Sequence, residues 1–151
     1  MLKVGDAIPD FSAPASTGGS LSKADLAGKP FILFFYPKSF TSGCTIETRH
    51  FALLAPQIRE LGAQVVGISI DPLEKQCKFA TETGADFPIL ADPDAVITKK
   101  FDLKRMLLPV AKRVTYLVDE KGFIEAIFAS ERGFKEHGDN VLKSLSARSR
   151  V

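Results

Sequence analysis

The sequence has little cysteine, little net charge and no long apolar run, and each shortage excludes a class of protein. Its two cysteines, Cys44 and Cys77, are too few for the disulfide framework of a small secreted domain. Twenty basic residues against 18 acidic ones leave a formal net charge of +2, far from the basic excess of a nucleic-acid-binding protein. The longest apolar run, Phe31 to Tyr36, is much shorter than the roughly 18 residues of a membrane span. We therefore expect neither nucleic acid nor membrane among the partners.

The residues that are present are those of an ordinary globular protein. The chain has 151 residues, of which 45% are hydrophobic and 25% charged. A chain of this size can bury roughly 68 to 70% of its extended surface without disulfide or metal, and we expect a single domain over residues 1–151. The first eleven residues carry Asp6 and Asp10 and lack the apolar core of a signal peptide. We therefore expect a cytoplasmic protein.

Short apolar runs alternate with helical patterns from residue 31 onward, which is typical of βαβ units. The first thirty residues are expected to form a short hairpin around residues 17–20. Gly122 is expected to supply the turn between the last two strands. Strands are predicted over 31–36, 64–70, 87–90, 114–118 and 123–129. The alternation predicts an α/β fold in which helices flank a central sheet.

Two of the predicted helices follow an Asp-Pro pair. Asp71 and Asp92 are expected to be N-cap residues and the prolines after them the first helical residues, with the helices ending near Thr83 and Phe101. A closing helix is predicted over about 134–147.

The helix after Pro37 is predicted over about 43–61. Ile46, Leu54, Ile58 and Leu61 recur close to a 3.6-residue period, so this face should pack on the sheet. Pro56 removes one backbone hydrogen bond and crowds the preceding turn, and we therefore expect a kink or break near Ala55.

Cys44 follows a strand, a turn and the small residues 41–43, which places its sulfur in the first turn of that helix. Backbone N–H groups there have no partners, and the positive end of the helix dipole stabilises an anion. Both effects favour the thiolate, which is the nucleophilic form of cysteine. A free cysteine beside a buried strand is also commonly an inert part of the core. The position alone leaves both interpretations open.

The residues around Cys44 favour chemistry. Pro37, Thr41 and Cys44 form the pattern Pro-x-x-x-Thr-x-x-Cys between strand and helix, within the stretch YPKSFTSGC. This pattern resembles the active-site loop of the peroxiredoxins. Its flanks, FFYPK and GCTIE, are most similar to the subgroup called bacterioferritin comigratory protein or peroxiredoxin Q. The resemblance extends over nearly the whole chain, through GDAIPDF (5–11), VGIS (66–69), LADP (90–93) and TYLVD (115–119).

The resemblance implies a thioredoxin-like α/β fold with a central mixed sheet, and a peroxidase that uses no metal, flavin or haem. It matches Cys44 to the peroxidatic cysteine, which attacks hydrogen peroxide or an organic hydroperoxide and becomes a sulfenic acid. It matches Thr41 to the hydroxyl that holds the peroxide, and Pro37 to the residue that screens the sulfur from water. Arg113 matches the arginine that keeps the thiolate charged and stabilises the transition state. Glu47 matches a family position that can orient an arginine.

Each of these side chains also has a plain structural explanation. Thr41 can simply cap the helix, and Pro37 can simply end the strand. Arg113 lies in the basic stretch 99–113, which is more typical of a solvated face than of a site. If the match to the family pattern is shifted by one residue, Lys112 is the alternative to Arg113 as the cation of the site.

The chain departs from the subgroup at the residue that resolves the sulfenic acid. Many members carry a resolving cysteine five residues after the peroxidatic one, and here that position is Arg49. Cys77 is a candidate resolving cysteine on the helix after the second strand, one turn earlier than in other members. However, Leu73, Cys77 and Ala80 form an i, i+4, i+7 stripe, which is typical of an inert core face. A one-cysteine mechanism, in which an external thiol reduces oxidised Cys44, is therefore slightly favoured.

The resemblance also implies the partners. Thioredoxin, glutaredoxin or a low-molecular-weight thiol such as glutathione would supply the electrons, and no motif in the sequence distinguishes them. We expect a monomer, as is common in the subgroup.

Other cysteine chemistries fit less well. A cysteine phosphatase needs an arginine six positions after the cysteine, and Arg49 is five after it. A cysteine hydrolase needs a histidine base, but His50 and His137 are expected to be exposed or core residues. Two cysteines and two scattered histidines do not form a zinc site, and Glu47 stands where a thioredoxin-like thiol oxidoreductase has its second cysteine. A non-enzymatic redox-sensing module is the remaining alternative, which catalytic turnover of peroxide at Cys44 would exclude.

Overall fold

The computed structural model describes residues 2–108 and 110–148, so the ends of the expected domain 1–151 lie outside the described residues. Its strands are β1 (Ser12–Pro14), β2 (Ser20–Ser22), β3 (Phe31–Phe35), β4 (Gln64–Ser69), β5 (Ile89–Ala91), β6 (Val114–Val118) and β7 (Ile124–Ala129). Its helices are the short 3-10 helix η1 (Ala24–Leu26) and the α-helices α1 (Ser42–Glu60), α2 (Leu73–Thr83), α3 (Val96–Lys100) and α4 (Glu136–Arg148).

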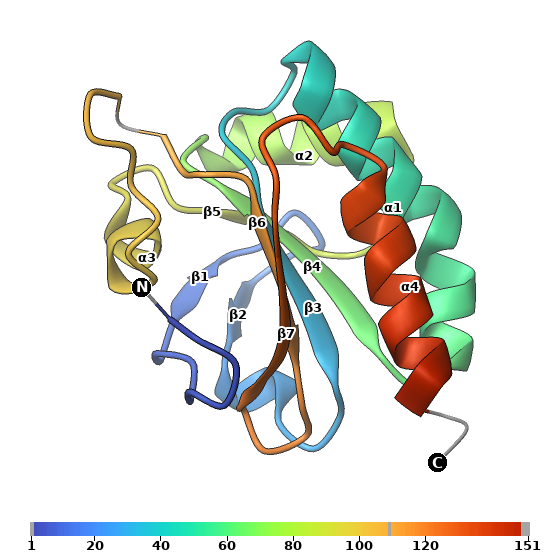
Figure 1. Ribbon diagram of the computed structural model, residues 1–151. Coiled ribbons are helices and arrows are strands. Elements are labelled where there is room, and N and C mark those ends of the chain that lie inside the picture. Colours follow the sequence, from blue (N-terminus) through green and yellow to red (C-terminus); the bar gives the residue numbers. More distant parts are fainter. Residues whose placement is uncertain (1, 109, 149–151) are drawn as a thin grey trace.

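Five strands form one mixed sheet in the order β5-β4-β3-β6-β7, and β1 and β2 form a separate antiparallel pair. β3, β4 and β5 run parallel to one another, with α1 and α2 as the connecting helices. β6 pairs antiparallel with both β3 and β7. In Figure 1, α1 and α4 lie side by side over one face of the sheet, whereas α3 and the β1-β2 hairpin lie on the other. The predicted α/β fold with a central mixed sheet is confirmed.

Alternate side chains of β3 enter two different cores, because successive residues of a strand point to opposite faces of the sheet. Leu33 and Phe35 pack on the side of the hairpin and α3. Ile32 and Phe34 pack on the side of α1, α2 and α4, where the ring of Phe34 stacks on Phe51 with 4.3 Å between ring centroids. All five residues of β3 are buried. β3 is thus the central strand of the sheet, buried over its whole length.

The predicted strands and hairpin are confirmed to within two residues. β1 and β2 pair with Ala13 opposite Leu21, and the turn between them contains Gly18 and Gly19. Gly122 has φ +89°, which is the left-handed backbone that the turn between β6 and β7 requires. The closing helix begins two residues later than predicted.

The prediction that Asp71 caps α2 is wrong. α2 begins at Leu73, with Pro72 as its N-cap residue and no side-chain cap. The buried Asp71 carboxylate instead accepts hydrogen bonds from the backbone N–H of Ser39 at 2.7 Å and from the hydroxyl of Ser69 at 2.5 Å. The reason is tertiary, because the chain after β3 passes close enough to compete for the carboxylate.

Asp92 does accept hydrogen bonds from α3, but the predicted start of that helix is wrong. Its carboxylate accepts from the backbone N–H groups of Ile97 and Thr98. α3 begins at Val96, three residues later than predicted, after Ala95 in a left-handed conformation with φ +56°.

Of the kink or break predicted near Ala55, the break is wrong, because the helix continues through Pro56 to Glu60. Proline costs one hydrogen bond here, while Ala55 and Ile58 beside it are fully buried in the core. Leu54 is buried as predicted, but Ile46 is 39% exposed. The buried side chains of the first turns are instead Cys44, Glu47, Thr48 and Phe51.

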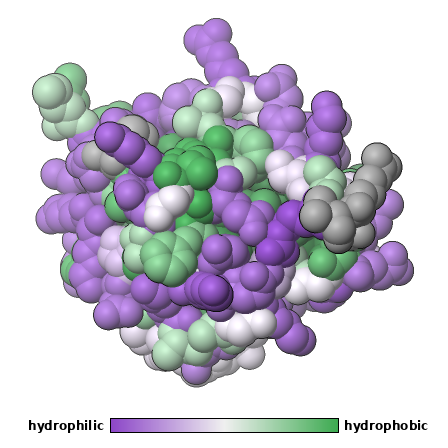
Figure 2. Space-filling view, turned by 60° about the horizontal axis from the view of Figure 1, so that its bottom comes forward, coloured by the Kyte–Doolittle hydropathy of each residue, from purple (hydrophilic) through white to green (hydrophobic). Residues whose placement is uncertain are grey.

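The surface seen in Figure 2 is mostly hydrophilic, with a smaller apolar area near its centre. Among the described residues, no helix is long and apolar enough to cross a membrane. The same part of the chain holds no group of three His, Cys, Asp or Glu side chains that could bind a metal ion. Several buried polar side chains come from segments around the carboxyl end of β3: Ser39, Glu47, Asp71 and Arg113.

Candidate active site

Cys44 lies in the first turn of α1, beyond the carboxyl end of β3. Residues 36–41 connect the two elements, and Thr41 is the N-cap residue of the helix. The carbonyl of Thr41 accepts the hydrogen bond from Thr45 that starts the helix. Cys44 is 1% exposed. The predicted position of its sulfur at a helix N-terminus is confirmed.

A single guanidinium lies against this sulfur. Nη2 of Arg113 lies 3.4 Å from Sγ of Cys44 and donates a hydrogen bond to it. Arg113 directly precedes β6, and Val114 pairs with Phe35, so strand pairing brings the arginine to the end of β3. Arg113 is only 6% exposed, and its interpretation as part of a solvated basic face is therefore wrong. A buried guanidinium in this position attracts negative charge on the sulfur.

Glu47, three residues after Cys44, binds another part of the guanidinium. Nη1 of Arg113 donates a hydrogen bond of 2.7 Å to Oε1 of Glu47, which is fully buried. Burial raises the pKa of the Glu47 carboxyl to about 8, although the charge and hydrogen bond of Arg113 lower it. Burial therefore favours the protonated carboxyl, and Oε1 accepts the hydrogen bond from Arg113 in either protonation state.

The segment between β7 and α4 covers the guanidinium from a further side. Nε of Arg113 donates to the carbonyl of Glu131 at 3.0 Å, and the backbone N–H of Arg113 donates to Oε2 of the same residue at 2.9 Å. Cζ of Arg113 lies 4.8 Å from the centre of the Phe134 ring, at cation–π distance. A Cβ at Gly43 would lie 2.4 Å from this ring. Any larger residue before Cys44 would therefore displace this ring.

Thr41 and Pro37 lie in the turn that leads to Cys44. The hydroxyl of Thr41 donates to the carbonyl of Lys38 at 2.7 Å, and it makes no capping hydrogen bond to α1. Thr41 is thus the N-cap residue by position, as the plain structural explanation has it, but its side chain does not cap the helix. Pro37 is half-buried and comes two residues after the end of β3.

A buried polar network fastens this turn to α2. The Tyr36 hydroxyl lies 2.8 Å from that of Ser39, which donates to Oε1 of Gln76 at 2.6 Å. Burial raises the pKa of Tyr36, so its hydroxyl stays protonated. Phe40 has φ +69°, a strained conformation for a bulky residue, and its ring packs on Phe79 of α2 with 5.2 Å between centroids. These contacts thus anchor the turn to α2.

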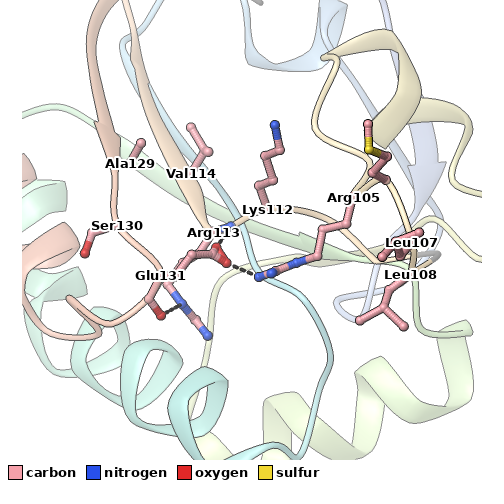
Figure 3. A pocket seen from close by; sticks show the side chains of 10 residues that line it. Arg105, Leu107, Leu108, Lys112, Arg113, Val114, Ala129, Ser130 and Glu131 are labelled. Carbon is pink, nitrogen blue, oxygen red and sulfur yellow. Dashed lines mark hydrogen bonds and ion pairs between the residues drawn. The ribbon is translucent and has the colours of Figure 1, made fainter.

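A hollow of about 600 Å³ opens on the other side of Arg113. Figure 3 shows Arg105 and Arg113 both bound to Glu131, and the side chains of Lys112 and Arg113 pointing to opposite sides. Cys44 does not line the hollow. Arg113 lines the hollow and also contacts the sulfur of Cys44. The apolar side chains of its wall are Met106, Leu107, Leu108, Val114 and Ala129.

The structure corrects two further predictions. Lys112 is exposed and turns away from the site, so the alternative of a one-residue shift is wrong. Cys77 is also exposed, and the stripe predicted to be a core face is not buried. Both cysteines are free thiols, and Sγ of Cys77 lies 4.0 Å from the carbonyl oxygen of Ser16. The buried residues of α2 are Gln76, Phe79 and Thr83.

The sequence does not indicate a role in the site for three residues that the structure places there. Glu131, Phe134 and His137 lie 18 to 24 positions after Arg113, in a segment that carries no motif. His137, expected to be an exposed or core residue, is buried with Nδ1 3.6 Å from Oε2 of Glu47. Their places depend on how the segment after β7 folds back over Arg113, which no local pattern encodes.

Comparison with known proteins shows the family of the chain. Residues 4–127 match the model of the AhpC/TSA family. The chain belongs to this family. A putative peroxiredoxin of Mycobacterium tuberculosis is 39% identical over 97% of both chains. The peroxiredoxin Bcp of Escherichia coli K12 is 31% identical over 95% of this chain and 96% of its own.

Solved structures of peroxiredoxins superpose closely on the whole chain. The crystal structure of peroxidoxin BcpB from Mycobacterium tuberculosis has a TM-score of 0.90 at 38% identity, covering 97% of this chain and 98% of its own. A peroxiredoxin Q mutant from Xylella fastidiosa also has a TM-score of 0.90, at 26% identity, covering 99% and 98%. The thioredoxin-like fold and the peroxiredoxin resemblance are confirmed. The protein is a thiol-dependent peroxidase, with a peroxide as substrate and a thiol as reductant.

Proposed function

We propose that Cys44 is the peroxidatic cysteine, and the observation that carries this proposal is the 3.4 Å contact between its sulfur and Arg113. The thiolate attacks the hydroxyl oxygen of a hydroperoxide, the O–O bond breaks, and Cys44 becomes a sulfenic acid. The departing alkoxide or hydroxide takes a proton and leaves as alcohol or water. Charge moves from the sulfur to the departing oxygen, so a preorganised cation beside both is the main requirement.

The neighbouring residues have distinct proposed roles. Arg113 stabilises the thiolate and then the charge on the departing oxygen, and Glu47 holds it in place through the bond to Nη1. The hydroxyl of Thr41, whose hydrogen is directed to Lys38, can accept the hydrogen of the peroxide. Pro37 shields the sulfur from bulk water. No cofactor is required, because the sulfur itself is oxidised.

The hollow beside Arg113 supports organic hydroperoxides as substrates in addition to hydrogen peroxide. Its apolar wall, formed mainly by the loop before β6, can receive the organic substituent while Arg113 lies close to the reacting oxygens. Hydrogen peroxide has no substituent and does not need this wall.

We further propose that Cys77 resolves the sulfenic acid. Its exposure removes the main argument for an inert core residue, and the network from Ser39 to Gln76 already joins the Cys44 turn to α2. The Cys77 thiolate would attack the sulfur of oxidised Cys44, form a disulfide and release hydroxide. Because Cys44 is buried, this step requires the first turn of α1 to open. Thioredoxin is then the expected reductant, rather than glutaredoxin or glutathione.

The deciding experiment is intact-mass analysis with thiol trapping after one equivalent of peroxide. The wild type is expected to lose two hydrogens as the Cys44 to Cys77 bridge forms. Cys77→Ser is expected to stop at a sulfenic acid, and Cys44→Ser not to react. If the wild type also stops at a sulfenic acid, the protein is a one-cysteine enzyme. Peroxidase turnover in Cys44→Ser would contradict the role of Cys44.

We propose a monomer in the cytoplasm. Two free thiols and no disulfide among the described residues fit a reducing compartment. Light scattering after size exclusion should give the mass of one chain, and a dimer at micromolar concentration would contradict this proposal.

A further inference from the structure

We propose that His137 is a positioning residue of the peroxidase site, acting on Arg113 through Glu47 and through the segment that joins β7 to α4. This inference rests on the function proposed above. His137 is the second residue of α4, it is 1% exposed, and it takes no part in the steps described so far.

The hydrogen bonds of the ring define its neutral tautomer. Nε2 lies 2.9 Å from the backbone carbonyl of Ser130, which can only accept, so Nε2 carries the hydrogen. Nδ1 is therefore the acceptor, and the hydroxyl of Thr115 donates to it at 2.7 Å. The ring thus connects α4 to β6 and to the residue that follows β7.

The first connection to Arg113 is mechanical. The backbone N–H of Ser130 donates to the carbonyl of Arg113 at 3.4 Å, and the Ser130 hydroxyl accepts from Gly133 at 2.9 Å. Between these anchors lies Glu131, whose carbonyl binds Nε of the guanidinium. By holding the Ser130 carbonyl, His137 fixes the segment that carries two of the contacts to Arg113.

The second connection is electrostatic and passes through Glu47. Oε2 of Glu47 is buried without a hydrogen-bond partner, and it lies 3.6 Å from Nδ1 of His137. Burial lowers the pKa of His137, and the charge of Arg113 lowers it further. Since burial raises the pKa of Glu47 and lowers that of His137, burial favours a proton on the carboxyl over a second proton on the ring. Besides Glu47 and Arg113, the charged group that acts on the ring is Glu136 on α4, which raises its pKa. Cys44 and Glu131 contact Arg113 rather than the ring.

The protonation state of Glu47, next to His137, determines whether Arg113 lies beside a neutral carboxyl or a carboxylate. While Glu47 is protonated, its carboxyl does not compete with Cys44 for the charge of Arg113. When the proton is lost, the carboxylate competes for the guanidinium and repels the thiolate. The rate at which Cys44 reacts should therefore fall as the pH rises through about 8.

The test measures the pH profile of Cys44 reactivity in the full chain with Cys77→Ser, so that one thiol reacts. Two reagents are used, hydrogen peroxide and an alkylating agent, because alkylation reports the thiolate whether or not the protein reduces peroxide. His137→Leu removes both hydrogen bonds. In His137→Gln, the amide N–H can still donate to the Ser130 carbonyl, but the side chain has no group that titrates. His50→Gln is the matched control, because His50 pairs with Asp139 near the surface.

His137→Leu should slow the reaction of Cys44 with peroxide by about tenfold or more at pH 7, since small displacements of a catalytic group cost up to about 10²-fold. The substitution should also change the pH at which the rate of Cys44 falls in alkaline solution, with hydrogen peroxide and with the alkylating agent. His137→Gln should recover most of the rate but not the wild-type profile, and the control should match wild type in both respects. Thr115→Val is nearly isosteric and removes the hydroxyl that donates to Nδ1 of His137. It should change the pH at which the rate of Cys44 falls without unfolding the protein.

Two results would overturn the inference. One is a folded His137→Leu whose rates and pH profiles equal those of wild type. The other is a lower melting temperature in the His137 and Thr115 variants while their rates and pH profiles stay as in wild type. That result would mean that the ring is structural only. A wild type that is alkylated at Cys44 but does not react with peroxide would instead contradict the proposed function.

Discussion

Arg113 and Cys44 are 69 positions apart in the chain, yet Nη2 of the arginine lies 3.4 Å from the sulfur. The remaining guanidinium nitrogens are also held, Nη1 by Glu47 and Nε by the carbonyl of Glu131. The side chain is therefore fixed before any peroxide arrives, and little reorganisation is needed as charge develops.

The first prediction concerns this arginine. Arg113→Ala should slow the oxidation of Cys44 by well over tenfold, up to the roughly 10²- to 10³-fold loss seen when a preorganised donor is removed. Stopped-flow measurement of the second-order rate with hydrogen peroxide checks this. Arg59→Ala is the control, because this exposed arginine pairs with Asp86 on another part of the surface. An unchanged rate in folded Arg113→Ala would show that the cation has no role in the reaction.

The second prediction concerns the close packing at Gly43. In Gly43→Ala, the new Cβ would meet the Phe134 ring at 2.4 Å, so the ring and the guanidinium beneath it must shift. We expect a stability loss of about 1 to 3 kcal/mol, as for overpacking elsewhere, together with slower oxidation of Cys44. Chemical denaturation and peroxide kinetics measure the two effects. Ser42→Ala, in the same turn but exposed, should show neither.

The third prediction is a pH dependence of stability from Glu47. Burial raises its pKa from 4.5 in the unfolded chain to about 8, so the folded state binds more protons between these values. Its contribution is complete below pH 4.5 and is lost as the pH rises through 8. Burial lowers the pKa of His137 below 6.5, so that group acts only at lower pH, where its stabilising contribution is lost as the pH falls.

Urea denaturation between pH 6.5 and 8.5 isolates the Glu47 effect. The free energy of unfolding of wild type should fall across this range, and that of Glu47→Gln should fall less, because the amide cannot ionise. Parallel curves for the two proteins would mean that Glu47 is already ionised at pH 6.5.

The fourth prediction concerns the hollow. Leu108→Ser makes its wall polar and should raise the KM for an aromatic hydroperoxide such as cumene hydroperoxide severalfold, with little effect on hydrogen peroxide. Each buried methylene is worth about 0.8 kcal/mol, which limits the effect to this order. Leu53→Ser is the control, since Leu53 is exposed on α1. Equal effects on the two peroxides would show that the hollow does not select substrates.

The local pattern of the sequence determined most of the secondary structure. Apolar runs and glycine turns gave the strands to within two residues, because these signals act between neighbours in the chain. The same local reasoning placed Cys44 at the start of α1, and the Pro37, Thr41 and Cys44 pattern was sufficient to indicate the family. It failed at Asp71, where Ser39 from another segment competes for the carboxylate.

Only the tertiary structure decided which side chains surround the sulfur. Whether Arg113 was a solvated or a buried cation depended on the pairing of β6 with β3, and whether Cys77 was core or surface depended on which face of α2 met the sheet. Glu131 and His137 reach the site because the segment after β7 folds back over Arg113. Such contacts form between segments far apart in the chain, and their energies depend on burial and packing, which no local spacing records.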